Sequence, residues 1–230
     1  MMDALASITA AADAAIAQRG LLDNPYFATL ADGSMSLDQF RRSQEQFFWA
    51  VEFFSRPMAG LVARLPDPKQ RLDILHNVVE EHGDFDVNRF HATTFKQFLA
   101  SIGADVDGIP DLELWPEVRA FNCCLTTACL HDEIEVGVAT MGVIEYSFAD
   151  ISQLIGQAVV ARGFVSQEDL VHYKLHAQID KRHAQEFFEV LVDQWGRDDR
   201  RYFIQQGIEL GVYVFDRLYR DLLATARRSA

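Results

Sequence analysis

The chain has 230 residues, of which 49% are hydrophobic and 24% are charged, and its formal net charge is -13. These values are typical of one soluble globular domain, and so acidic a chain lacks the basic surface that nucleic acids and anionic membranes require of a partner. No apolar run reaches the roughly 18 residues of a membrane span and no secretory signal opens the chain, so we expect a cytoplasmic protein.

Apolar residues recur at helical spacing along the whole chain, and the period-two alternation of half-buried strands is absent. After a first helix, the segment from Asn24 to Phe27 is predicted to turn the chain. Ser36 starts a capping box, Pro57 is expected to kink the helix that follows, and Ser166 with Asp169 is expected to cap the seventh helix. The predicted helices cover residues 4–18, 37–64, 69–82, 87–102, 113–130, 133–162, 166–195 and 198–227. They predict an all-α fold in a single domain over residues 1–230.

The three cysteines, Cys123, Cys124 and Cys129, lie together in one predicted helix. A disulfide framework has an even number of cysteines that are spread along the chain. We therefore expect three reduced thiols in the core.

Three polar residues share one face of the seventh predicted helix. His176, Asp180 and His183 stand at i, i+4 and i+7, so a helix turns their side chains the same way. The same face continues into Phe187 and Val190, which belong in an apolar core. Two imidazoles and a carboxylate that face a core are costly unless each has a partner. A metal ion would satisfy all three; a polar cluster joined by hydrogen bonds is the alternative.

Glu145 is the only charged residue between Glu135 and Asp150. Its helical neighbours are small or apolar, so its side chain is expected to point inward. A lone buried glutamate is protonated, with a raised pKa, unless a cation stabilises its charge. Its helix precedes the triad helix by one turn, so we expect the two helices to be antiparallel neighbours. Glu145 is then either a further ligand or a protonated acid that is hydrogen-bonded to a neighbouring helix.

A third polar cluster surrounds the end of the third predicted helix. Glu80 and Glu81 lie where the helix dipole disfavours negative charge, which indicates a positive partner. Adjacent helical residues point about 100° apart, so one of the two is expected in the site, and we prefer Glu81. His91 is followed at i+4 and i+7 by Phe95 and Phe98 and is therefore expected to face inward too.

Glu52 and His172 allow more than one interpretation. Glu52 is either a further ligand or a solvated side chain, and His172, one turn before His176, is a candidate for the lining of a substrate path. The aromatic residues around Glu52 either line an apolar pocket or simply fill the core. They are Phe47, Phe48, Trp49, Phe53 and Phe54.

The inward candidates form a mixed set of carboxylates and imidazoles without a thiolate. They are Glu81, His91, Glu145, His176, Asp180 and His183. Six ligands exceed the three or four of a zinc site and suit two iron or manganese ions bridged by carboxylates. Asp180 and His183 resemble one half of the ferritin-like ligand motif, but Asn88 stands where the second half needs a glutamate before His91.

The order of these residues resembles that of the haem-oxygenase-like diiron oxidases and oxygenases, which include CADD proteins and are related in fold to TenA and PqqC. That family has a carboxylate at a helix end, a histidine soon after, a glutamate on a later helix, and then H-x3-D-x2-H. Glu81, His91, Glu145 and the triad that starts at His176 match this order, within a resemblance over about residues 20 to 220. It implies a single haem-oxygenase-like bundle of seven to eight helices.

The resemblance also implies a non-haem enzyme with two Fe ions, manganese being an alternative at one position, and with O2 as co-substrate. The expected substrate is a small organic molecule such as an amino acid, an amine or a fatty acid, and the expected assembly is a homodimer. Haem is not expected, because haem oxygenases hold it with a histidine in an early helix and no histidine precedes His76. The alternative is a metal-free TenA- or PqqC-like protein that binds a small molecule or serves cofactor metabolism.

Overall fold

The computed structural model describes residues 2–228, and within this range it has nine α-helices, three short 3-10 turns and no strand. The α-helices are α1 (Met2–Arg19), α2 (Pro25–Asp32), α3 (Leu37–Arg64), α4 (Pro68–Glu81), α5 (His91–Ser101), α6 (Pro116–Leu130), α7 (Ile134–Ala161), α8 (Val171–Trp195) and α9 (Asp198–Arg228). The predicted all-α fold is confirmed. Residues 1, 229 and 230 of the predicted domain lie outside the described range.

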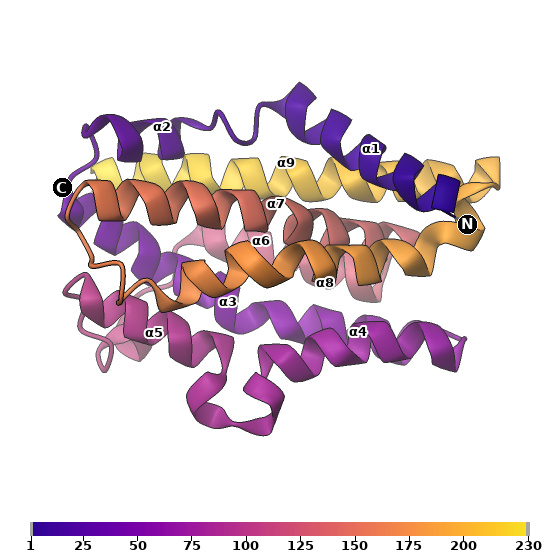
Figure 1. Cartoon of the computed structure of the whole chain (residues 1–230), viewed down its shortest axis with the longest axis horizontal. Coiled ribbons are helices and arrows are strands. Elements are labelled where there is room, and N and C mark those ends of the chain that lie inside the picture. The colour runs from indigo at the N-terminus through magenta and orange to yellow at the C-terminus, as the bar shows by residue number, and fades with distance from the viewer. Residues whose placement is uncertain (1, 229–230) are drawn as a thin grey trace.

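Helix α7 is the centre of the bundle. Its sequence is apolar on nearly every side, and such a helix is stable only when it is covered all around. The consecutive residues Val138, Ala139 and Thr140 point about 100° apart, and all three are buried. The helix packs most extensively against α8 and then against α9. Figure 1 shows these three helices side by side, with α1 and α2 on one side of them and α3, α4 and α5 on the other.

Gly142 allows α7 and α8 to approach each other closely. A Cβ atom at this position would lie 2.9 Å from Cβ of Phe187 and 2.9 Å from Cε1 of Phe188. Carbon atoms do not pack at that separation, so any larger residue has to push the two helices apart. Glu145 lies three residues further along α7, so the glycine helps to set how near this glutamate comes to α8.

The beginning of the chain contains one helix more than predicted. Asn24 does not merely turn the chain: it caps α2, because its side-chain oxygen accepts a hydrogen bond from the backbone N–H of Tyr26. Pro25 occupies the first helical position, where its missing N–H costs nothing. The next helix, α3, has the predicted bounds, and the capping box at Ser36 forms with Gln39 as predicted.

The helix that was predicted to start at residue 87 begins only at His91. Before it, Asp84 and Phe85 have positive φ angles, which no α-helix tolerates. The side chain of Asp86 then accepts a hydrogen bond from the backbone N–H of Asn88 and holds a 3-10 turn. The connection between α4 and α5 therefore projects from the body of the bundle (Figure 1), and His91 lies in the first turn of α5.

The predicted cap of the seventh helix is also wrong. Ser166 and Asp169 do bond to each other, but they form a turn, and α8 begins at Val171. In the same way, the helix expected from residue 113 begins at Pro116, since proline is accommodated best in a first helical turn.

The prediction of three core thiols is only partly right. All three cysteines are free, but only Cys129 is buried, while Cys124 is half-buried and Cys123 is exposed. Successive residues of α6 point about 100° apart, so adjacent cysteines cannot share its buried face.

No helix within residues 2–228 is long and apolar enough to span a membrane.

Replacing Gly142 with valine is expected to destabilise the protein by about 2 kcal/mol or more, because the new side chain overfills the contact between α7 and α8. Urea unfolding monitored by circular dichroism measures the change. The matched control is Gly196→Val at the end of α8, where an added Cβ meets nothing within 4 Å and φ is negative. Equal unfolding midpoints for the two variants would contradict the close packing.

Candidate metal centre

The structure brings all six predicted ligands into one buried place. Glu81 ends α4, His91 begins α5, Glu145 lies in the middle of α7, and the remaining three lie on α8. None of the six is more than 8% exposed. The predicted antiparallel pairing of α7 with α8 brings Glu145 to the other predicted ligands.

Three of these residues form a first group. Glu145, Asp180 and His183 each offer a ligand atom, and these atoms all lie within 4.8 Å of one another. Nδ1 of His183 is 3.8 Å from a carboxylate oxygen of Glu145 and 3.8 Å from one of Asp180. These separations are too long for hydrogen bonds, and they suit ligands that share one ion at about 2.0–2.2 Å each.

The other three residues form a second group beside the first. Nδ1 of His91 lies 2.7 Å from Oε1 of Glu81. The rings of His91 and His176 have centroids 4.5 Å apart. The two groups meet on α8, where Nδ1 of His176 is 2.8 Å from Oδ1 of Asp180.

Three of the six residues have a buried polar atom with no hydrogen-bond partner among the described residues. These atoms are Oε1 of Glu145, Nε2 of His176 and Nδ1 of His183. Each such atom costs about 1–3 kcal/mol, and native proteins leave few of them. A cation bound between them would satisfy all three, and carboxylate oxygen with imidazole nitrogen is a donor set that suits iron and manganese. The residues therefore fit a metal site.

The pKa values of the first group are displaced in the direction expected for a cluster without its cation. Burial and the neighbouring Asp180 raise the pKa of Glu145 to about 7. Burial raises the pKa of Asp180 well above its usual range. Burial opposes a charge on His183, but its interaction with Glu145 outweighs this effect and raises its pKa to about 10. Binding of a cation by this group would therefore compete with protons.

Burial has the opposite outcome at His176, where it lowers the pKa to about 3. This ring is therefore neutral near pH 7, as a metal ligand must be. Burial also opposes the charge on Glu81, but the nearby His91 outweighs it and keeps the pKa of Glu81 below its ordinary value.

Glu80 supports the cluster from outside. Its carboxylate is 2.9 Å from Nε2 of His183, the nitrogen on the far side of the ring from Glu145 and Asp180, and it also accepts a hydrogen bond of 2.6 Å from Arg182. A carboxylate behind a metal-binding histidine fixes the orientation of the ring and increases the basicity of the other nitrogen. Glu81 lies beside His91 inside the cluster, so the two adjacent glutamates approach it from different sides.

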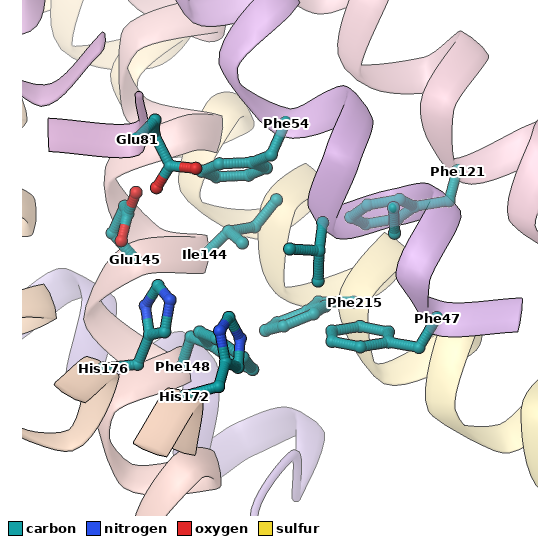
Figure 2. A pocket seen from close by; sticks show the side chains of 12 residues that line it. Phe47, Phe54, Glu81, Phe121, Ile144, Glu145, Phe148, His172, His176 and Phe215 are labelled. Atoms are coloured by element: carbon teal, nitrogen blue, oxygen red, sulfur yellow. The ribbon is translucent and has the colours of Figure 1, made fainter. Parts of the chain in front are cut away.

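A cavity adjoins the cluster. Figure 2 shows Glu81, Glu145, His172 and His176 at one end of it and phenylalanine rings along the rest of the wall. Those rings belong to Phe47, Phe54, Phe121, Phe148 and Phe215, which come from four helices. The cavity therefore presents a polar end next to the candidate ligands and an apolar remainder.

Of the aromatic residues predicted around Glu52, only Phe47 and Phe54 line this cavity. Phe48 is buried in the core, while Trp49 and Phe53 line a hollow on the surface together with Glu52. Glu52 is exposed, so the solvated alternative is correct for it. The reason is the 100° step of α3, which spreads consecutive residues over opposite faces.

Two supporting residues were not recognised from the sequence. Glu81 is preferred to Glu80 on the sequence, which does not reveal the contact of Glu80 with His183, a residue 103 positions away. Thr94, whose hydroxyl lies 3.1 Å from Nδ1 of His172, has no sequence signal of such a role. A threonine in the first turns of a helix commonly bonds only to its own backbone.

Known proteins resemble this chain in sequence and in fold. A family model described as "Iron-containing redox enzyme" matches residues 41–214. The 4-aminobenzoate synthase of Chlamydia muridarum is 22% identical over 188 residues, which cover 81% of this chain and 78% of that protein. The 4-aminobenzoate synthase of Nitrosomonas europaea is 24% identical over 184 residues, 75% of this chain and 73% of that protein.

A TenA homologue from Pseudomonas syringae superposes with a TM-score of 0.75 at 18% identity, covering 95% of this chain and 91% of that chain. The predicted TenA-like fold is confirmed.

Binding of Fe(II) is expected to release protons and to strengthen as the pH rises. The folded pKa of Glu145, about 7, lies above its ordinary value of 4.5, so the carboxyl group holds its proton up to about pH 7 and has to lose it to bind a cation. The affinity should rise by up to about tenfold per pH unit for each proton released. Anaerobic titrations with Fe(II) at several pH values measure this slope, and an affinity that does not change with pH would contradict it.

Glu145→Gln tests whether Glu145 causes this pH dependence of Fe(II) binding. A carboxyl group whose folded pKa is raised stabilises the fold below its unfolded pKa and loses this contribution as the pH rises through the folded value. Without the carboxyl group, the pH slope of Fe(II) binding below pH 7 should be smaller, and the metal-free variant should melt at or above the temperature of the parent at pH 8.

Glu80→Gln is expected to weaken iron binding about 10- to 100-fold although it removes no predicted ligand, because a neutral amide no longer increases the basicity of His183. Competition with a chelator measures the affinity. Glu189→Gln is the control, since that glutamate is an exposed residue of α8 that bonds only to Gln185. Parental affinity in Glu80→Gln would rule out the supporting role.

Proposed function

We propose that this chain, which belongs to the family of iron-containing redox enzymes, binds two iron ions and uses them with O2 to oxidise a small organic molecule. Family membership makes the protein an oxidoreductase. The number of ions, the use of O2 and the substrate are the proposal. The ligands that we assign are Glu81, His91, Glu145, His176, Asp180 and His183.

The observation that carries the proposal is the group of three unpartnered polar atoms, on Glu145, His176 and His183, that are buried inside the bundle. The alternative, a metal-free binding protein of TenA or PqqC type, expects a cluster whose members satisfy each other by hydrogen bonds. Glu145 and His183 do not meet that expectation, because 3.8 Å separates their nearest polar atoms. A cation between them supplies the missing partner.

Two ions account for the arrangement better than one. The six residues fall into two groups of three, one around His183 and one around His91. Each group has both a carboxylate and an imidazole, and carboxylates bridge neighbouring ions in sites of this kind. A site with three or four ligands would leave the second group without a function.

Iron bound here supplies redox chemistry and open coordination positions that no side chain offers. The chain's own residues do the remainder. Glu80 holds the ring of His183 so that Nδ1 faces the cluster. Phe148 and Phe215 belong to the apolar wall that keeps water away from the reacting end of the cavity.

The relatives indicate a substrate class. Two of them are named for the synthesis of 4-aminobenzoate, an aromatic amine. A cavity walled by phenylalanine rings suits a small molecule with a substantial apolar part, and we propose an amine, an amino acid or a fatty acid as the substrate of this chain.

His176→Ala and Asp180→Ala are each expected to reduce iron binding from about two ions per chain to one or none and to leave a folded helical protein. The apo fold should survive because these buried groups cost stability when no metal is bound. Metal analysis after anaerobic loading with Fe(II), together with O2 consumption, measures the effect. His131→Ala is the control, since His131 is exposed. Parental iron content in both variants would refute the assignment.

A further inference from the structure

We propose that His172 binds the substrate through Nε2, which accepts a hydrogen bond from an N–H or O–H group of that molecule. The inference rests on the proposed function, in that it assigns the substrate's position in the same site. It limits the substrate to small, largely apolar molecules that carry a hydrogen-bond donor, such as alcohols, phenols and amines.

His172 stands at the boundary between the polar and apolar parts of the cavity. Figure 2 shows its ring between His176 on one side and the rings of Phe215 and Phe47 on the other. The side chain is completely buried, and the centroid of its ring is 4.3 Å from that of His176. A molecule bonded to His172 therefore lies beside the candidate metal ligands.

Hydrogen bonding to Thr94 determines which nitrogen of His172 carries the proton. The Thr94 hydroxyl lies 3.0 Å from the backbone carbonyl of His91, which can only accept, so the hydroxyl proton is used there. The same hydroxyl oxygen lies 3.1 Å from Nδ1 of His172 and can then only accept from it. Nδ1 of His172 is therefore the protonated nitrogen, and Nε2 carries a lone pair.

Nε2 of His172 is buried and has no hydrogen-bond partner among the described residues. An unsatisfied acceptor costs about 1–3 kcal/mol, and this one belongs to a residue that lines the cavity. A donor on the substrate is the partner that this atom lacks.

The rest of the wall determines what else the substrate carries. No lysine or arginine of the described residues lines the cavity, so the wall itself provides no counter-charge for an anionic group. Apart from His172 and the polar end formed by Glu81, Glu145 and His176, the wall consists of phenylalanine and aliphatic side chains. The free volume is about 40 Å³, enough for one or two water molecules. A larger molecule requires lining side chains to move, and Val51 and Phe54 are the two lining residues that are only half-buried.

The protonation of His172 is measured directly by 15N NMR of the metal-free protein labelled at histidine. A proton on Nδ1 and a bare Nε2 are expected. Thr94→Val removes the acceptor and should allow the other tautomer to appear. Thr93→Val is the matched control, since Thr93 is the preceding residue of α5 and bonds to Val87 instead. A proton on Nε2 in the parent overturns the proposal.

Phenol and toluene are the probes of binding, because they have similar size and differ in one O–H donor. Both are titrated by calorimetry into the metal-free protein, and again after anaerobic loading with Fe(II). The phenol-to-toluene affinity ratio should fall about two- to tenfold in His172→Phe, because this factor corresponds to the loss of one neutral hydrogen bond. It should recover in His172→Gln, whose amide oxygen reaches the position of Nε2. It should also fall in Thr94→Val but not in Thr93→Val.

An unchanged ratio in His172→Phe, or no measurable binding of phenol to the parent, overturns the proposal. Loss of iron in both His172→Phe and His172→Gln, while circular dichroism shows them folded, overturns it as well, because His172 would then be a metal ligand. Failure of the proposed function would look different: the parent would hold fewer than two irons per chain, while the probe ratios of the metal-free variants would be as described.

Discussion

The structure depends above all on the close contact between α7 and α8. It is possible because Gly142 has no side chain where Phe187 and Phe188 press against α7. The same contact brings Glu145 opposite Asp180 and His183. The packing of α7 against α8 therefore forms both the middle of the core and the middle of the polar cluster. The surrounding helices cover this pair: α9 lies along α7, while α4 and α5 add Glu81 and His91 at its edge.

Burial of so many ionisable groups opposes folding and favours metal binding at the same time. Burial raises the pKa values of Glu145 and Asp180, whereas attraction to the neighbouring carboxylates raises the pKa of His183 against the effect of burial. The apolar covering of α7 and α9 has to outweigh that cost. The ligand atoms are therefore already in place before a metal ion binds, and this reduces the conformational entropy that binding would otherwise cost.

Two histidines near the cavity, His183 and His172, are each held from behind by a residue of another helix. Glu80 of α4 bonds to the far nitrogen of His183, and Thr94 of α5 lies against the far nitrogen of His172. Such contacts leave the near nitrogen with a defined lone pair or proton. The rings of His183 and His172 are therefore oriented for different partners, a metal ion for the first and a substrate donor for the second.

The sequence by itself determined the helical class, the bounds of α3, and the six inward-facing polar residues, because helical periodicity depends only on neighbours within a few turns. It also determined that His176, Asp180 and His183 share one face. It was wrong about the start of α5, where the 3-10 turn capped by Asp86 and the extended Phe90 occupy the predicted first turn. Only the tertiary structure decided which nitrogens of His172 and His183 are bonded from behind and that Glu80 supports the site. These outcomes depend on contacts between residues 78 and 103 positions apart, and helical spacing has no information about contacts at that range.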